Sequence, residues 1–359
     1  MEIFSIPDSI SFGLPSSEMF KIPNQPYKHD PNLRPPPLNN TPRSFFHPFD
    51  IDPDLFRVSF QLEYVITFMS LYVTAVLFMN SVNASRHYRP WAFSKTSAFK
   101  AFVVAHNSLL ALFSGWALSS LVYTLINYWP SGSTNSNDGY FAHIAEYLCQ
   151  TQSSEYRVLS HSISPWEAGW NYIGWLFYMS KYYEVIDTMI ILAKGKKSSM
   201  LQTYHHAGII LCGWATVVYD SPCGLVAAIN VLVHTLMYTY FALQTLGFSV
   251  STRVKRSLTT IQIAQFFIGM IFGTSFLFLS YKAPLDMSEM AVKNDSVLDF
   301  SPLASHGDTA RLVPKDTMVP CLSDSGEAAT IYVSTIYIWP LIFLFVRFFI
   351  QSYSPKKKQ

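Results

Sequence analysis

The chain has 359 residues, of which 50% are apolar, 16% are aromatic and only 13% are charged, with a net charge of +2. A soluble domain usually carries about 25% charged residues, and a disordered protein is rich in charge and poor in aromatic residues. Four Cys are too few for a disulfide-stabilised miniprotein. A net charge of +2 does not provide the basic surface that a nucleic-acid-binding protein needs. The class that remains is an integral membrane protein.

Residues 1–58 differ in composition from the rest of the chain, because eleven of the 21 Pro lie there. We expect a Pro-rich, mostly extended N-terminal arm that packs near its end. No basic segment followed by an apolar one marks the start, so we expect no cleaved signal peptide. A helical domain is predicted over 59–350, with an insertion at about 282–327, and a short tail over 351–359.

Seven apolar stretches of this domain are long enough to cross a membrane, since a spanning helix needs about 20 residues. Only helices or closed barrels satisfy the backbone in lipid, and no period-2 alternation is sustained here. We therefore predict an all-α membrane protein. The predicted helices are 60–80, 101–127, 166–193, 201–219, 221–252, 257–281 and 328–346.

The distribution of Lys and Arg predicts the orientation of the chain. The first, third and fifth connections between helices and the tail are basic, whereas the second holds only Arg157 and the fourth holds none. We expect a lumenal N-terminus and a cytosolic C-terminus. The tail ends in Lys356-Lys357-Lys358-Gln359, a dilysine pattern for retrieval to the endoplasmic reticulum. The alternative is a stop-transfer cluster that binds anionic lipid headgroups.

Cysteines and glycosylation sequons add predictions for the lumenal side. Cys149 and Cys321 fall in its two long segments, where an oxidising compartment favours a disulfide, and Cys223 is the competing partner. Sequons occur at Asn39, Asn83 and Asn294. We expect Asn83 to face the cytosol unmodified and treat the other two as candidate glycosylation sites.

Polar side chains inside the predicted helices are costly in lipid and usually face the bundle interior. Here they recur every three or four residues, which places each set on one helix face. The sets, in chain order, are His106 and Asn107; Lys181, Glu184, Asp187 and Thr188; Gln202, His205 and His206; Asn230, His234, Met237, Tyr238 and Phe241; and Thr259, Gln262 and Gln265. Because three His lie in adjacent helices at matching depth, we expect one functional site.

Simpler interpretations stay open for part of this set. Asn107, Thr259, Gln262 and Gln265 are equally well explained as hydrogen bonds between helices. A metal centre is disfavoured because membrane di-iron enzymes need several clustered boxes of His, and only four His lie within the helices. Cys212 lies about 10 Å along the helix axis from His205, too far for activation as a nucleophile. A third possibility, besides a metal centre and a thiol nucleophile, is that a neutral imidazole takes an acyl group from a thioester.

Four ordered motifs within about 85 residues carry a family resemblance. They are Lys181–Thr188, similar to KxxExxDT; Gln202–His206, similar to HxxHH; Asn230–Tyr240, similar to NxxxHxxMYxY; and Thr259–Gln265, similar to TxxQxxQ. Together they resemble the ELO family of very-long-chain fatty acid elongases, the 3-oxoacyl-CoA synthases. Gln202 in place of the first His resembles the Gln-x-x-His-His group of fungal and polyunsaturated-type elongases, so polyunsaturated acyl chains are candidate substrates. Phe241 replaces the final aromatic Tyr.

The resemblance implies a reaction and roles for these residues. His205 would take the acyl group from acyl-CoA, beside His234 and His206, and malonyl-CoA would lose CO₂ and attack it. The product would be a 3-oxoacyl-CoA two carbons longer, with CoA released. The residues implied to order the pocket or meet the substrates are Lys181, Glu184, Asp187, Gln202, Asn230, Tyr238, Gln262, Gln265 and Asn107.

The resemblance also implies an architecture and partners. Helices two to seven would ring a closed-ended acyl tunnel, with the first helix outside. No metal or bound cofactor is implied, and the co-substrates are acyl-CoA and malonyl-CoA. The expected partners are membrane lipid, the reductases and dehydratase of the elongation cycle, and a second copy of the chain, since related enzymes form dimers. The alternatives are a metal-dependent membrane lipid oxidase or desaturase and, from another class, a seven-helix transporter or receptor.

Overall fold

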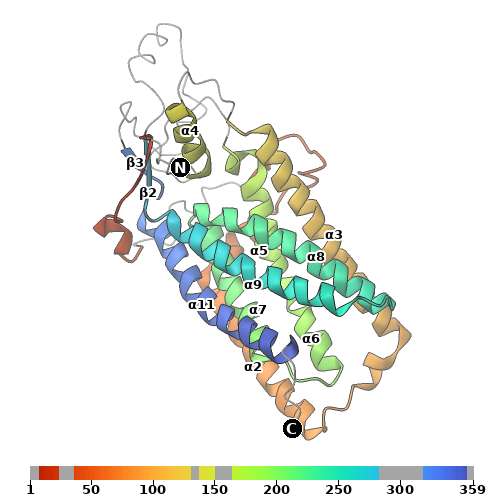
Figure 1. Cartoon of the computed structure of the whole chain (residues 1–359). Helices are drawn as coiled ribbons and strands as arrows, with labels where there is room; N and C mark the ends of the chain where they lie inside the picture. The colour runs from red at the N-terminus through yellow and green to blue at the C-terminus, as the bar shows by residue number, and fades with distance from the viewer. Residues whose placement is uncertain (1–7, 24–35, 131–136, 150–163, 283–317, 354–359) are drawn as a thin grey trace, which may run out of the picture.

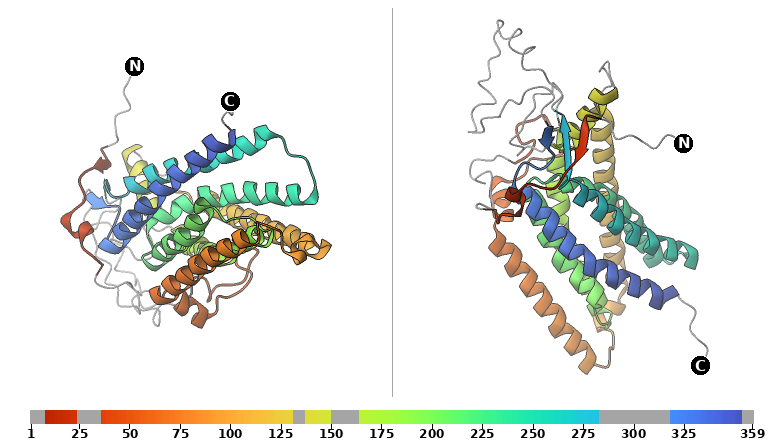
Figure 2. Two further views of the ribbon diagram at one scale, coloured as in Figure 1. Left: turned by 90° about the horizontal axis from the view of Figure 1, so that it is seen from below. Right: turned by 60° about the vertical axis from the view of Figure 1, so that its left-hand side comes forward.

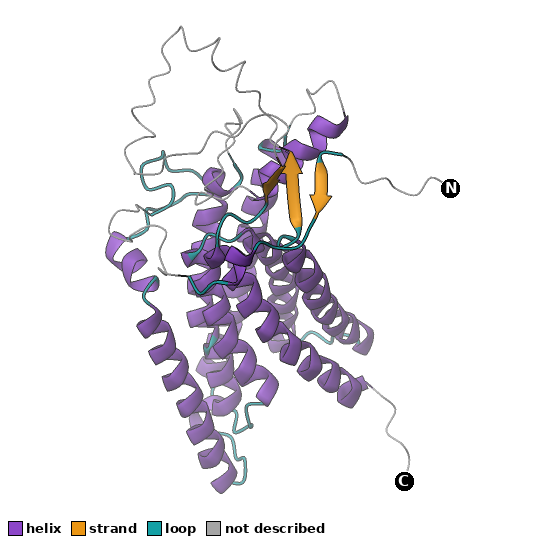
Figure 3. Ribbon diagram, turned by 90° about the vertical axis from the view of Figure 1, so that its left-hand side faces the viewer, coloured by secondary structure: helices purple, strands orange, loops and turns teal. Residues whose placement is uncertain are grey.

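The computed structural model describes residues 8–23, 36–130, 137–149, 164–282 and 318–353, and this part of the chain is mostly helical (Figures 1 and 3). The main helices are α2 Leu62–Ser85, α3 Ser97–Asn127, α5 Asn171–Glu184, α6 Ile186–Ala193, α7 Met200–Val218, α8 Leu225–Leu246, α9 Thr252–Ser275 and α11 Ser325–Tyr353. The shorter helices are α1 Pro53–Ser59, α4 Asn137–Cys149, η1 Ser17–Phe20, η2 Ala92–Lys95, η3 Trp166–Trp170 and η4 Pro222–Gly224. The strands are β1 Ile10–Phe12, β2 Leu279–Lys282 and β3 Met318–Pro320.

Among the described residues, five helices are long and apolar enough to cross a membrane: α2, α3, α8 with its preceding turn, α9 and α11. The chain is therefore a mostly helical, multi-pass membrane protein, as predicted. The predicted count of seven spanning helices is not confirmed. The stretch 166–193 is divided among η3, α5 and α6, with Gly169 at a φ of 142° and Val185 outside both helices. The remaining stretch, 201–219, forms α7.

The long helices pack in a closed order around a common interior. Helix α3 packs on α8, α8 on α9, α9 on α11, α11 on α7, α7 on α5, and α5 on α3. Helix α2 lies on the outside of this ring, against α7 and α6 (Figure 2). The chain runs back and forth, so the connections 86–96, 194–199 and 247–251 gather at one end, which we call the basic end. The small sheet lies at the other end (Figure 3).

Two predicted helix boundaries are wrong, each for a local reason. The helix predicted over 257–281 ends at Ser275, because residues 279–282 form β2 between β1 and β3 in an antiparallel sheet. The helix predicted over 221–252 ends at Leu246, where Gly247 takes the left-handed conformation with φ 104°. A Gly in that conformation closes a helix, and here the amides of Gly247 and Phe248 donate to the carbonyls of Gln244 and Leu243.

The end of the N-terminal arm is part of the core. Asp52 caps α1 by accepting a hydrogen bond from the Leu55 amide at 2.8 Å, and Phe56 and Phe60 are buried. The Trp214 indole donates to the Phe60 carbonyl at 2.8 Å, which ties the arm to α7. The packing predicted for the end of the arm is therefore present.

The sequon asparagines differ in their surroundings. Asn83 is completely buried at the basic end, where its amide donates to the carbonyls of Leu192 and Lys196, so the folded chain offers no room there for a glycan. Asn39 exchanges hydrogen bonds with the backbone of Ile51. Asn294, like the dilysine tail, lies outside the described residues.

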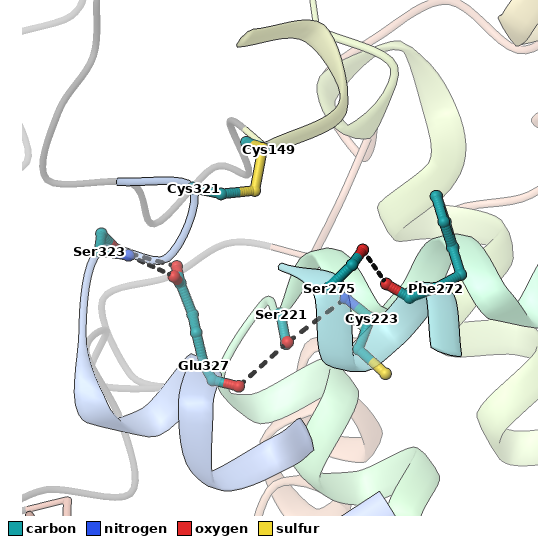
Figure 4. The surroundings of a disulfide bond; sticks show 8 residues. All are labelled: Cys149, Ser221, Cys223, Phe272, Ser275, Cys321, Ser323 and Glu327. Carbon is teal, nitrogen blue, oxygen red and sulfur yellow. Dashed lines mark hydrogen bonds between the residues drawn. A yellow bond between two sulfur atoms is a disulfide. The ribbon is translucent and has the colours of Figure 1, made fainter. Parts of the chain in front are cut away.

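A disulfide closes the end that carries the sheet. Cys149 of α4 and Cys321 after β3 are bonded, with Cα atoms 5.0 Å apart, and Cys223 is a free thiol set apart from them (Figure 4). Beside the disulfide, Glu327 accepts hydrogen bonds from the amide and hydroxyl of Ser323 at 2.7 and 2.9 Å. We call this the disulfide end.

We expect Cys321→Ser to lower the apparent Tm of the purified protein, because the disulfide joins residues 172 positions apart and such bonds contribute about 2–5 kcal/mol. Thermal unfolding in detergent, with and without a reductant, measures the effect. Cys223→Ser is the matched control and should leave Tm unchanged. A wild-type Tm that is insensitive to a reductant that cleaves the bond contradicts the prediction.

Candidate active site

A buried ion pair forms the centre of the polar residues on α5. The Lys181 ammonium donates to Glu184 at 2.7 Å, and Ser180 donates to the same carboxylate oxygen at 3.2 Å. The exposed fractions of Lys181 and Glu184 are only 2% and 1%. The ammonium also lies 3.7 Å from the ring centre of Phe177, a favourable cation–π contact. Two charges removed from solvent persist only when each has such partners.

Asp187, at the start of α6, ties three helices together. One carboxylate oxygen lies 2.9 Å from Nε2 of His106 on α3, and the other accepts from the Tyr238 hydroxyl on α8 at 2.8 Å. Both partners are buried. The carboxylate therefore holds α3, α6 and α8 in register around the interior.

The first two turns of α7 carry the histidine pair. Ser199 caps this helix by accepting from the Gln202 amide at 3.2 Å, so the start of the helix is fixed just before the pair. The Gln202 side chain lies 2.7 Å from Nε2 of His206. The ring centres of His205 and His206 are 5.4 Å apart, and Nδ1 of His205 lies 2.9 Å from the Tyr337 hydroxyl on α11.

His234 on α8 completes the group. Its Nδ1 lies 3.5 Å from the Lys181 ammonium and 3.6 Å from a Glu184 oxygen. It is also within electrostatic range of His205 and His206. The structure thus brings together side chains of four helices, α5, α6, α7 and α8. We call the following residues the polar cluster: Lys181, Glu184, Asp187, Gln202, His205, His206, His234 and Tyr238.

The remaining predicted site residues lie apart from these contacts. Asn230 donates to Gln265 at 3.3 Å, which links α8 to α9. The Gln262 amide lies 3.3 Å from the sulfur of Met237, on the same pair of helices. Asn107 donates at 2.9 Å to a carbonyl of its own helix. Within the described part of the chain, no three His, Cys, Asp or Glu side chains are grouped as a metal site.

An apolar cavity of about 180 Å³ extends from the polar cluster toward the disulfide end. It is lined mainly by α5, α7, α8, α9 and α11. Lys181, Asn230 and Tyr337 border it near the polar cluster, and Trp166 and Gly224 border it near the disulfide end. Along α5 the lining runs from Lys181 to Asn171, about 15 Å at the rise of an α-helix. A long apolar group could lie here with its polar end beside Lys181 and Tyr337.

Sequence reasoning missed two tyrosines that contact the polar cluster. Tyr337 bonds His205, and Tyr72 on the outer helix α2 bonds the Thr188 hydroxyl at 2.9 Å. Thr188 in turn lies 3.5 Å from the Gln202 amide. Both tyrosines lie in charge-free stretches of sequence, so they do not belong to any of the sets of regularly spaced polar residues. The one available signal is Gly208, one turn after His205, where the Tyr337 ring lies against the helix.

Comparisons with known proteins agree with the resemblance drawn from the motifs. A family model described as "ELO: GNS1/SUR4 family" matches residues 58–359. Over 111 residues the chain is 35% identical to "Fatty acid elongase 2" of Trypanosoma cruzi and 38% identical to "Long chain fatty acid elongase 2" of Caenorhabditis elegans. Each match covers 30% of this chain and only 40% of the relative.

A longer match covers more of another relative. The chain is 28% identical over 225 residues to "Fatty acid elongase sre1" of Dictyostelium discoideum, which is 60% of this chain and 74% of that protein. No solved structure matches the chain significantly.

Proposed function

The chain belongs to the ELO (GNS1/SUR4) family, and on that premise we propose that it is a fatty acid elongase, a 3-oxoacyl-CoA synthase. It would condense a long-chain acyl-CoA with malonyl-CoA through an acyl-imidazole on His205. The observation that carries this proposal is that Lys181 and Tyr337, which contact His234 and His205 respectively, line an apolar cavity.

The two parts of the proposed substrate match the two parts of the site. An acyl chain in the cavity would gain about 0.8 kcal/mol for each methylene removed from water. Its thioester would then lie beside Lys181 and Tyr337, which border the cavity and contact His234 and His205 respectively. Binding of the tail thus brings the reacting carbon to the nucleophile, which removes much of the entropy cost of the reaction.

The second half of the proposed reaction needs a dry site with fixed donors. Loss of CO₂ from malonyl-CoA leaves an enolate, which water would quench. The Lys181 ammonium and the ring of His234 lie together, are almost fully buried, and could stabilise the enolate oxygen. The carbanion carbon then attacks the acyl carbon and releases the imidazole.

We further propose a location in the endoplasmic-reticulum membrane, with the disulfide end lumenal and the basic end cytosolic. A disulfide favours an oxidising lumen, and the basic connections favour the cytosol. Both CoA esters would then approach from the basic end, because the polar cluster lies nearer to that end than to the disulfide end. The reductases and the dehydratase of the elongation cycle would act on the product, and polyunsaturated chains are candidate substrates.

The test is incubation of the purified protein in detergent or nanodiscs with mixed acyl-CoAs and labelled malonyl-CoA. The proposal predicts 3-oxoacyl-CoA products two carbons longer and one CO₂ for each product. Absence of malonyl-CoA consumption by a folded preparation would favour a transporter or receptor. Stoichiometric iron or zinc together with an oxidised lipid product would favour the metal-dependent oxidase or desaturase.

A substitution at Gly174 tests whether the cavity limits the length of the acyl chain. It lines the cavity two turns of α5, or about 10 Å, from Lys181, and a side chain added there would meet no atom within 4 Å. Gly174→Leu should therefore project into the cavity without disturbing the fold and exclude the end of a long acyl chain. Losing two buried methylenes costs about 1.6 kcal/mol, so we expect the preference for long over short acyl-CoAs to fall about tenfold.

Elongation rates across a series of acyl-CoAs of increasing length measure this effect. Gly13→Leu is the matched control, because Gly13 is equally free of close neighbours yet lies outside the cavity between the helices. An unchanged length preference in Gly174→Leu contradicts the idea that the acyl chain lies in this cavity.

A further inference from the structure

Tyr337 stands between the cavity and His205. Its side chain borders the cavity, and its hydroxyl oxygen lies 2.9 Å from Nδ1 of His205. The same hydroxyl lies 3.1 Å from the backbone carbonyl of His205. Tyr204 stacks on the Tyr337 ring, with ring centres 5.5 Å apart and an interplanar angle of 23°. The tyrosine is thus held by α7 on two sides.

Gly208 makes this approach of α11 to α7 possible. A Cβ added at Gly208 would run into the Tyr337 ring. Glycine is therefore required there if the ring is to lie against the helix one turn beyond His205. The Tyr204 hydroxyl also donates to the backbone carbonyl of Tyr337 at 3.2 Å.

The two contacts of the Tyr337 hydroxyl point to one arrangement of protons. A carbonyl oxygen can only accept, so a hydrogen bond to the His205 carbonyl uses the single hydroxyl proton of Tyr337. The hydroxyl oxygen is then left to accept from the ring, which requires the proton of His205 to sit on Nδ1. In a neutral imidazole the other nitrogen, Nε2, then has a free lone pair.

We propose that Tyr337 is a positioning residue that keeps the His205 proton on Nδ1 and so leaves Nε2 as the nucleophile. This inference rests on the proposed function. The Nε2 lone pair attacks the thioester carbon, the carbon–sulfur bond breaks, and the CoA thiolate leaves and takes a proton from solvent. The acylated ring keeps its Nδ1 proton, still bonded to Tyr337, and carries the positive charge.

The same hydrogen bond serves the return step. When the enolate attacks the acyl carbon, the carbon–nitrogen bond breaks and its electron pair returns to Nε2. The ring becomes neutral again with its proton still on Nδ1. No proton has to move between the two ring nitrogens during the cycle, and the Tyr337 oxygen stabilises the cationic intermediate.

Tyr337→Phe removes only the hydroxyl and tests the proposal. We expect the rate of CoA release from acyl-CoA alone, measured as a pre-steady-state burst, to fall about 10- to 100-fold, by analogy with the loss of a partner that orients a metal-binding histidine. The KM for acyl-CoA should stay within about threefold of the wild-type value, because the acyl chain loses no contact. Gly208→Ala should slow the same burst by displacing the ring, although it keeps the hydroxyl.

Tyr332→Phe is the matched control, since it deletes a hydroxyl from another tyrosine of α11, one for which the described residues offer no hydrogen-bond partner. Its burst rate should stay within threefold of wild type, and both tyrosine variants should share the wild-type Tm within a few degrees. A wild-type burst rate in Tyr337→Phe overturns the proposal, as does an equal loss in Tyr332→Phe. A wild-type protein that neither releases CoA nor elongates would instead contradict the proposed function.

Discussion

Replacing His205 with Ala is expected to abolish condensation while the protein stays folded. The variant lacks the ring nitrogen that would accept the acyl group, and loss of a nucleophile typically lowers turnover by on the order of 10⁴-fold or more. His205 is only partly buried and bonds Tyr337 alone among the described residues, so its removal breaks few contacts. Elongation assays with labelled malonyl-CoA measure the loss.

Two comparisons make the His205→Ala result specific. Gln202→His restores the first position of the HxxHH pattern and should retain activity within about tenfold, since either side chain can hold His206 by a hydrogen bond. His234→Ala should also lose condensation because it removes the group beside Lys181. Full activity in His205→Ala would show that the acyl group is transferred without this side chain.

The second large effect is expected from Lys181→Met, which leaves the Glu184 carboxylate buried without its cation. Removing one partner of a buried pair costs about 3–5 kcal/mol. A change of that size should lower the apparent Tm by about 5 °C, judged from the unfolding entropy per residue of soluble domains. Thermal unfolding in detergent measures the shift, and elongation activity should be lost as well.

The double variant Lys181→Met/Glu184→Gln separates stability from chemistry. It removes both charges, so most of the lost Tm should return, since a buried pair replaced by neutral groups is often close to neutral in stability. Activity should stay low because the buried ammonium beside His234 is still absent. A double variant as unstable as Lys181→Met would mean that the charges are not the main stabilising feature of this contact.

The sequence predicted much of the bundle because lipid constrains it strongly. Charge-free runs must be helical in a membrane, and all seven predicted stretches are largely helical, although only five of the described helices are apolar enough to count as spans. The cost of polar groups in lipid likewise predicted the stripe of Lys181, Glu184 and Asp187, which does face the interior. The family membership inferred from four motifs is confirmed by the match over residues 58–359.

The features that the sequence did not predict depend on contacts between segments that are distant in sequence. Residues 279–281 continue a charge-free run, and the segment 279–282 forms a strand only because β1 and β3 lie beside it. Tyr337 lies in an uncharged stretch of α11, so the sequence alone suggests a lipid-facing or packing residue. Its contact with His205 spans 132 positions and exists only because Gly208 lets the helices meet.

Whether His205 carries the acyl group is measured most directly by the mass of the protein after incubation with acyl-CoA alone. Acyl transfer to His205 predicts release of CoA and a mass gain of one acyl group, located by peptide analysis at His205 and absent in His205→Ala. An adduct on His206 or His234, or elongation by a protein that never acquires an adduct under these conditions, would contradict it.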